Sequence, residues 1–285
     1  MYMKKLIPVI IIILTISILC ILYVYRNTNK QDDRNINNEI KTDENNIEQK
    51  NEEIIEKPIQ YIEYSEKPAD ETDSYFEKII QLEGQYTYYS HPLKVEKDKK
   101  VRLIVYSHGS NTTVSNSFNT QFMKDLQKYG NFFSKKGYAF IASNQHGANY
   151  GNDASIQDIE NSIKYMRANY LIEDKVYHIG FSMGGLPAIY HSMKYNKSVG
   201  KLALLAPVTY STSWKNQNKL SLLKPIDIKI WHGDKDVNVP YSASQDFIKD
   251  SKQANINIVL ETLNNKTHWD VDTELMKEIL EFYEQ

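Results

Sequence analysis

The sequence predicts an α/β fold with a doubly wound, mostly parallel sheet. Short apolar runs alternate with longer amphipathic runs over roughly 200 residues, and several short runs are nearly continuous Val, Ile and Leu. Polar residues follow the points where those runs end. Strands covered by helices on both faces are apolar along their whole length. Alternation of such strands with helices is typical of a parallel sheet with helices on either side.

The expected elements follow one another with few long gaps. Strands are expected at Tyr86–Tyr89, Val101–Ser107, Tyr138–Ser143, Val176–Gly180, Lys201–Ala206, Ile226–His232 and Ile256–Thr262. Helices are expected at Gln121–Lys136, Ser155–Tyr170, Leu186–Tyr195, Ser242–Gln253 and Val271–Tyr283. Pro187 falls in the first turn of its helix, where a missing N–H costs nothing. These elements define a domain over residues 71–285.

The N-terminal region contains a candidate membrane span. Residues 6–25 read LIPVIIIILTISILCILYVY, without a charged side chain, and follow a short tail, residues 1–5, that contains Lys4 and Lys5. A helix of that length covers about 30 Å, the thickness of the hydrocarbon core. The small residues of a cleavage site, or those that precede a lipoprotein cysteine, are missing around Cys20. We therefore expect an uncleaved, single-pass signal anchor in the cell membrane, with the catalytic domain outside the cytoplasm.

A polar segment separates this span from the domain. Residues 26–70 are rich in Asn and charged side chains, and their first half has no aromatic residue. Too little apolar surface is available there to offset the entropy of ordering the chain. We expect a disordered tether. The net charge of −2 provides no basic field for nucleic acid, and one cysteine excludes an intramolecular disulfide.

A Gly-x-Ser-x-Gly motif lies between a predicted strand and a predicted helix. It reads Gly-Phe-Ser-Met-Gly-Gly over residues 180–185, with Ser182 at its centre. In this setting the chain makes a sharp, strained turn that presents the serine hydroxyl at the carboxyl end of the sheet. Ser182 is therefore a candidate nucleophile, and the chain a candidate serine hydrolase.

An acid and a base follow later strands. Asp236 belongs to His-Gly-Asp-Lys-Asp after the strand ending at His232, and His268 lies just ahead of the last helix. Carboxyl ends of parallel strands meet at one edge of a sheet, so these side chains can converge. Histidine titrates near neutral pH and can take the serine proton, while a buried carboxylate orients the imidazole. Asp234 competes for the acid position and His146 for the base.

This order of nucleophile, acid and base resembles the α/β-hydrolase superfamily across residues 86–285. Short-lidded esterases of the dienelactone-hydrolase and serine-aminopeptidase-like branches are the most similar. The resemblance implies Ser182 as nucleophile, His268 as general base and Asp236 as the orienting acid. Developing negative charge on the substrate oxygen needs fixed donors, and we expect the N–H groups of Met183 and Ser110 to supply them.

Two features depart from the family pattern. The oxyanion loop reads His-Gly-Ser-Asn, not His-Gly-Gly-Gly, and Thr267 precedes the base instead of glycine. Only about twenty residues separate the strands at 201 and 226, so no large lid is inserted there.

No cluster with metal-ligand spacing is present, and we expect neither a metal nor a cofactor.

The expected function is a membrane-anchored serine hydrolase of the carboxylesterase type that works through an acyl-enzyme. Its substrate would be a small-molecule or envelope-associated ester, with residues 6–25 as the membrane partner and no nucleic acid. The same triad also supports a serine peptidase or an acyltransferase. A catalytically idle surface binding module is the alternative from a different class.

Overall fold

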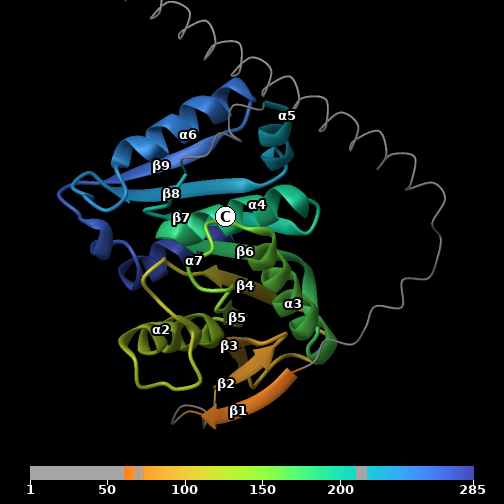
Figure 1. The fold of residues 1–285 in the computed structure, drawn as a ribbon. Coiled ribbons are helices and arrows are strands. Elements are labelled where there is room, and N and C mark those ends of the chain that lie inside the picture. The colour runs from red at the N-terminus through yellow and green to blue at the C-terminus, as the bar shows by residue number, and fades with distance from the viewer. Residues whose placement is uncertain (1–60, 68–71, 73, 210–216) are drawn as a thin grey trace, which may run out of the picture. The chain divides into compact units, whose positions relative to one another are not determined.

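The computed structural model describes residues 61–67, 72, 74–209 and 217–285 (Figure 1). Its strands are β1 (Tyr61–Lys67), β2 (Tyr75–Leu82), β3 (Gln85–Pro92), β4 (Val101–Ser107), β5 (Tyr138–Ser143), β6 (Ile172–Phe181), β7 (Val199–Leu205), β8 (Asp227–Gly233) and β9 (Ile258–Leu263). Its α-helices are α2 (Gln121–Lys135), α3 (Asp153–Asn169), α4 (Gly185–Lys194), α5 (Gln217–Leu220), α6 (Tyr241–Gln253) and α7 (Met276–Glu284). Short 3₁₀ turns are η1 (Ser182–Gly184), η3 (Ser221–Leu223), η4 (His268–Asp270) and η5 (Thr273–Leu275).

The nine strands of the described residues form one mixed sheet in the order β1-β2-β3-β5-β4-β6-β7-β8-β9. Strands β4 to β9 are parallel to one another, and β1, β2 and β3 extend the sheet in antiparallel fashion from β5. The α/β fold with a mostly parallel sheet is therefore confirmed.

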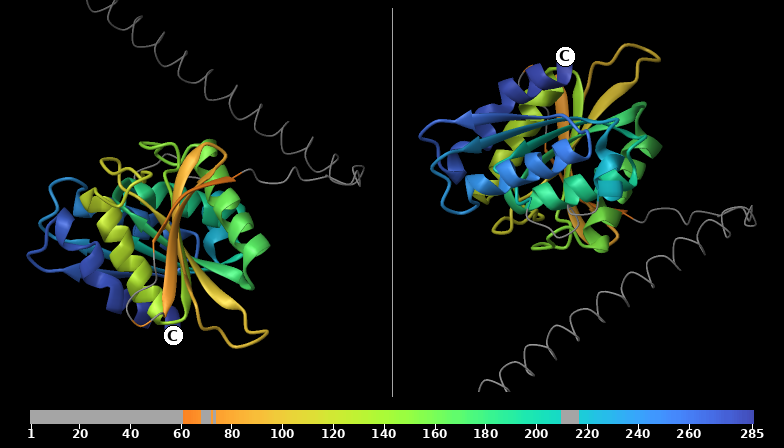
Figure 2. Two further views of the ribbon diagram at one scale, coloured as in Figure 1. Left: turned by 90° about the horizontal axis from the view of Figure 1, so that it is seen from below. Right: turned by 90° about the horizontal axis from the view of Figure 1, so that it is seen from above.

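Helices cover both faces of the sheet (Figure 2). Helices α3, α4 and α6 pack on one face, and α2 and α7 pack on the other. Strand β4 contributes side chains to the core on both faces of the sheet. Leu103 and Val105 belong to the hydrophobic cluster under α3, α4 and α6, and Ile104 and Tyr106 belong to the cluster under α2 and α7. Because side chains alternate along a strand, burial on both faces requires the unbroken apolar run that β4 has.

The strand order reverses at β4, which lies between β5 and β6. The connection through α2 leads to β5 on one side of β4, and the connection through α3 crosses back to β6 on the other. Loops that leave in opposite directions open a crevice at the carboxyl ends of these strands. The residues that follow β4 and β6 therefore meet at one place.

The N-terminal edge of the sheet differs from the sequence expectation. The segment Tyr86–Tyr89 is the centre of a longer strand, β3, which forms a hairpin with β2 through Glu83 and Gly84. Both turn residues have positive φ, 43° and 83°, as a tight two-residue hairpin requires. Strand β1 lies inside the range 26–70 that was predicted to be tether, so the described part of that range contains a strand that was not expected. Antiparallel pairing with β2, which composition does not reveal, is the reason.

The last helix also begins later than expected. The segment predicted as one helix over Val271–Tyr283 contains the 3₁₀ turn η5 and then α7 from Met276. At the break, Asp272 has a non-helical backbone, with φ −101° and ψ −110°. Its carboxylate accepts hydrogen bonds from Tyr106 on β4 (3.1 Å) and Tyr129 on α2 (2.8 Å), tertiary contacts that the local sequence pattern does not indicate.

Within the described part of the chain, no helix has the length and apolar character needed to cross a bilayer. The predicted span at residues 6–25, the tail at residues 1–5 and the tether up to residue 60 lie outside the described residues.

Candidate active site

Ser182 occupies a sharp turn between β6 and α4. Its φ of 55° lies in the left-handed region, which a non-glycine residue adopts only under constraint. Glycine at position 184 makes the turn sterically feasible, because a Cβ atom there would lie 2.0 Å from the Ser107 carbonyl oxygen. The strained turn raises the Ser182 hydroxyl above the sheet edge, as the motif predicts.

The three side chains expected to act together lie within hydrogen-bond distance. His268 Nε2 is 2.9 Å from Ser182 Oγ, and His268 Nδ1 is 2.7 Å from Asp236 Oδ2. All three residues are at least 90% buried. Because a carboxylate can only accept, Nδ1 carries the proton and Nε2 is free to accept the serine hydroxyl proton. The arrangement therefore has the polarity that a serine nucleophile requires.

The loop after β8 fixes the Asp236 carboxylate. Its Oδ1 atom accepts hydrogen bonds from the Asn238 and Val239 N–H groups, both at 2.8 Å. Asp234 is exposed, and its carboxylate accepts a bond from the Asn265 N–H group at 2.7 Å. Of the two candidate acids, Asp236 thus contacts His268, whereas Asp234 ties the acid loop to the loop that follows β9.

A cavity of about 150 Å³ opens above Ser182. Its described lining comprises Gly109, Ser110, Asn111, Thr112, Tyr150, Phe181, Ser182, Met183, Val208, Asn238, Val239, His268 and Trp269. The expected oxyanion donors, Ser110 and Met183, are both among them. The Met183 N–H lies in the first turn after the elbow, where helix geometry leaves N–H groups without an intrahelical partner. The cavity therefore brings the candidate nucleophile and both candidate donors to one space.

Buried His108 shapes the loop that bears Ser110. Its Nε2 atom lies 2.8 Å from the Asn144 carbonyl oxygen, and its Nδ1 atom lies 2.8 Å from the Gly109 carbonyl oxygen. Burial lowers the pKa of this imidazole, which favours the neutral ring. A neutral ring carries one N–H and donates to one of the two carbonyl oxygens. The ring thus joins the loop after β4 to the end of β5.

Comparison with family models assigns the chain to a protein family. A model described as phospholipase/carboxylesterase matches residues 138–285, slightly more than half of the chain. The chain belongs to the phospholipase/carboxylesterase family. Membership of the α/β-hydrolase superfamily, predicted from the motifs, is therefore confirmed. The comparison with curated proteins gives no match.

Solved structures share the fold of this phospholipase/carboxylesterase family member. Est1E from Butyrivibrio proteoclasticus is 18% identical with a TM-score of 0.54, covering 70% of this chain and 94% of its own. A candidate dienelactone hydrolase from Klebsiella pneumoniae is 12% identical with a TM-score of 0.56, covering 80% and 97%. A candidate dipeptidyl aminopeptidase IV from Bacteroides ovatus is 17% identical with a TM-score of 0.59. The last match covers 80% of this chain but 36% of the other, so this chain spans about a third of that protein.

His232 adds a contact to the candidate triad that the sequence did not indicate. Its Nε2 atom lies 3.2 Å from Asp236 Oδ2 and 3.0 Å from the Val239 carbonyl oxygen, and its Nδ1 atom lies 2.7 Å from Ser244 Oγ. The ring is fully buried, and burial lowers its pKa. A neutral ring that faces two acceptors through Nε2 must carry its proton there. In this family member, His232 therefore shares its one N–H between the Val239 carbonyl oxygen, which is the closer acceptor, and the acid.

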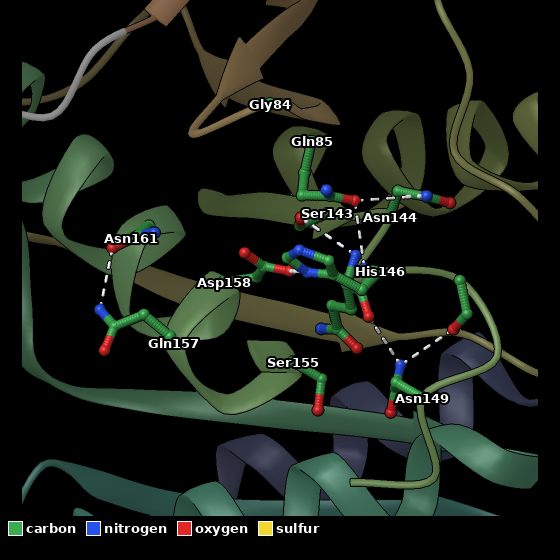
Figure 3. Close-up of polar contacts among 12 residues, drawn as sticks. Gly84, Gln85, Ser143, Asn144, His146, Asn149, Ser155, Gln157, Asp158 and Asn161 are labelled. Atoms are coloured by element: carbon green, nitrogen blue, oxygen red, sulfur yellow. Dashed lines mark hydrogen bonds and ion pairs between the residues drawn. The ribbon is translucent and has the colours of Figure 1, made fainter. Parts of the chain in front are cut away.

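His146, the rival candidate for the base, lies elsewhere. Figure 3 shows its ring turned toward Asp158 on α3, and the Nδ1 to Oδ2 distance is 2.7 Å. His146 does not line the cavity above Ser182. Burial raises the pKa of Asp158, and the contact with His146 offsets part of that rise. The pair anchors the loop after β5 to α3.

No group of three or more His, Cys, Asp or Glu side chains that could hold a metal ion occurs among residues 61–67, 72, 74–209 and 217–285.

Proposed function

We propose that this phospholipase/carboxylesterase family member is a serine carboxylesterase whose nucleophile is Ser182. The observation that carries the proposal is the hydrogen-bonded series Ser182–His268–Asp236, with distances of 2.9 and 2.7 Å, at the floor of a cavity. A serine hydroxyl is a weak nucleophile unless a base takes its proton during attack. In this series the base is in contact with the hydroxyl, and an acid holds the base.

The geometry supports a two-step reaction. Ser182 Oγ attacks the ester carbonyl carbon while its proton passes to His268 Nε2, and Asp236 stabilises the imidazolium. The Met183 and Ser110 N–H groups stabilise the oxyanion. Collapse of the tetrahedral intermediate breaks the bond to the alcohol oxygen, which receives the proton from His268. Water, deprotonated by His268, then attacks the acyl-enzyme. The bond to Ser182 Oγ breaks, His268 returns the proton to that oxygen, and the acid is released.

The size of the cavity supports esters of short acyl groups. A volume of about 150 Å³ is below the roughly 300–1,000 Å³ typical of pockets for drug-sized ligands. An acyl chain of a few carbons fills that space, whereas a long fatty acyl chain would extend beyond the described lining. Acetate and propionate esters are therefore the substrates to try first.

Replacement of the nucleophile tests the proposal. Ser182→Ala should lower kcat for p-nitrophenyl acetate by at least about a thousandfold, because loss of a triad member removes that much in serine hydrolases. Ser192→Ala is the matched control: Ser192 is buried on α4, outside the cavity, and its hydroxyl has no hydrogen-bond partner in the described part of the chain. Full activity of Ser182→Ala with an intact fold would exclude Ser182.

Hydrolysis, peptide cleavage and acyl transfer share the acyl-enzyme and differ in what attacks or leaves. The ratio of transfer product to acid should stay low as an alcohol or amine acceptor is raised, if water is the natural acceptor. A product mixture dominated by transfer at low acceptor concentration would instead favour the acyltransferase alternative.

The proposal includes a membrane anchor at residues 6–25. The support is sequence alone: twenty uncharged residues after Lys4 and Lys5. The chain should fractionate with membranes, resist extraction by high salt and carbonate, and be cleaved by protease added to intact cells. Recovery of the full chain in the salt-soluble fraction would contradict the anchor without bearing on the esterase.

A further inference from the structure

Trp269 is an exposed aromatic residue at the mouth of the cavity. It follows His268 directly in the sequence, lines the cavity above Ser182 and is 59% exposed. Large aromatic side chains are normally buried, and an exposed one beside a site is a candidate binding surface. No described residue covers this ring, so packing against the rest of the fold does not account for an aromatic side chain at this position.

The position of the ring is fixed by its neighbours. Trp269 lies in the turn η4, which a capping box closes: the Thr267 N–H and hydroxyl both donate to Asp270 Oδ2 at 2.7 Å. The indole and the His268 ring form a T-shaped pair, with centroids 5.2 Å apart and an interplanar angle of 86°. The Phe181 ring centroid lies 6.3 Å from the indole centroid. More than half of the Trp269 surface remains exposed to solvent.

The chemistry places the leaving group next to this surface. His268 Nε2 must give its proton to the departing alcohol oxygen, so that oxygen has to lie within hydrogen-bond distance of the imidazole. The carbonyl oxygen lies on a different side, at the Met183 and Ser110 N–H groups. The alcohol part of the ester therefore leaves along His268. Two aromatic rings of the cavity lining lie beside that imidazole, the buried Phe181 and the exposed Trp269, and of the two Trp269 offers the free surface.

We propose that Trp269 determines leaving-group specificity by stacking on the alcohol part of the ester, so that the preferred substrates pair a short acyl group with a planar, uncharged alcohol. The proposal rests on the proposed esterase function. None of the described residues that line the cavity is Lys, Arg, Asp or Glu. A charged alcohol would thus find no partner of opposite sign there, whereas an aromatic ring gains contact with the indole.

Two isomeric esters separate the alcohol side from the acyl side. Benzyl acetate carries its ring on the alcohol, and methyl phenylacetate carries it on the acyl group. In the full chain, Trp269→Ala should lower kcat/KM for benzyl acetate about tenfold, mainly through KM, and for methyl phenylacetate by less than about twofold. Trp269→Phe should recover most of the loss. Val237→Ala, which removes a 91% exposed side chain outside the cavity lining, should change neither value.

The outcomes separate this proposal from the esterase function. Equal losses on both isomers, or no loss on benzyl acetate, would overturn the role of Trp269 while Ser182-dependent hydrolysis still upheld the esterase. Hydrolysis that persists in Ser182→Ala would overturn both. Benzyl acetate should also exceed ethyl acetate in kcat/KM for the wild-type chain, since the two alkoxides are similarly basic; a wild-type chain without that preference would contradict the stacking. Because Trp269 is exposed, an unchanged melting temperature is expected for its variants.

Discussion

The Nε2 atom of His232 lies 3.2 Å from Asp236 Oδ2, the same oxygen that contacts His268 Nδ1. Asp236 therefore contacts two imidazoles at Oδ2, and its Oδ1 accepts hydrogen bonds from two backbone N–H groups. The carboxylate is held from both sides of the acid loop. Its orientation toward His268 thus depends on the end of β8 as well as on the loop itself.

Removal of the second imidazole should slow the reaction without abolishing it. A hydrogen bond to a charged group contributes about 1.5–3 kcal/mol. Because the His232 N–H is shared with the Val239 carbonyl oxygen, its share is at the lower end of that range, and we expect His232→Ala to lower kcat for p-nitrophenyl acetate by up to about tenfold, with a smaller change in KM. His232→Gln keeps a donor and should recover part of the rate. A wild-type kcat in a folded His232→Ala variant would show that the contact has no part in orienting Asp236.

Stability should depend on the protonation of Asp272. Loss of contact with water raises the pKa of its carboxyl group to about 6, while hydrogen bonds from Tyr129 and Tyr106 act in the opposite direction. Because this pKa is higher in the folded chain than in the unfolded chain, the protonated Asp272 carboxyl group contributes to the free energy of unfolding. That contribution is fully present below about pH 4 and is lost as the pH rises through 6. At pH 7.5 the loss amounts to at most about 3 kcal/mol. Asp272→Asn, which stays neutral and keeps an acceptor for both tyrosines, should be more stable than the wild type at pH 7.5.

Urea unfolding at several pH values tests this expectation. The free energies of unfolding of Asp272→Asn and the wild type should converge steadily from pH 7.5 to pH 4, because Asp272 becomes protonated over that range. Other titrating groups are the same in both chains and cancel in the comparison. A difference that does not vary with pH would mean that Asp272 titrates normally in the folded chain.

Glycine 184 should tolerate no side chain. A Cβ atom there would approach the Ser107 carbonyl oxygen to 2.0 Å, and that oxygen belongs to the backbone, which cannot move aside as a flexible side chain could. We expect Gly184→Ala to destabilise the fold by more than about 3 kcal/mol or to prevent folding. Gly84→Ala is the control, because its position has φ +83° but nothing within 4 Å of the added Cβ. That variant should lose only about 1–2 kcal/mol. Equal losses in the two variants would contradict the steric account.

His146 should be dispensable for the reaction and important for the fold. Its side chain is 46% exposed, whereas that of Asp158 is 4% exposed. His146→Ala leaves a buried carboxylate without its partner, so we expect a loss of about 2–3 kcal/mol of stability and a kcat within about twofold of wild type. His268→Ala should show the reverse, with stability retained and kcat lost. A kcat for His146→Ala as low as that of His268→Ala would reinstate His146 as a base.

Much of the core of the fold could be predicted from the sequence. The strand expected at Val101–Ser107 has those bounds, and the helix expected at Gln121–Lys136 ends one residue earlier, at Lys135. These elements are long or continuously apolar, so local periodicity determines them. Strands β1 and β2 were missed because antiparallel pairing, of β1 with β2 and of β2 with β3, makes them strands, and local pattern does not.

The candidate site divides in the same way. Ser182, Asp236 and His268 are marked by motifs at strand ends, which predict their convergence. The contact between His232 and Asp236 depends on how the acid loop folds back on β8. The exposure of Trp269 depends on how neighbouring segments pack around it. Neither leaves a local pattern in the sequence. Tertiary packing alone supplies both.

The most direct measurement is the site of covalent modification by a fluorophosphonate. Mass spectrometry of the treated full chain should find one adduct per chain, on the peptide that contains Ser182. The adduct should be absent in Ser182→Ala and should form far more slowly in His268→Ala. An unmodified Ser182 in a chain that still hydrolyses p-nitrophenyl acetate would contradict the account. A chain with neither adduct nor hydrolysis would favour a catalytically idle binding module.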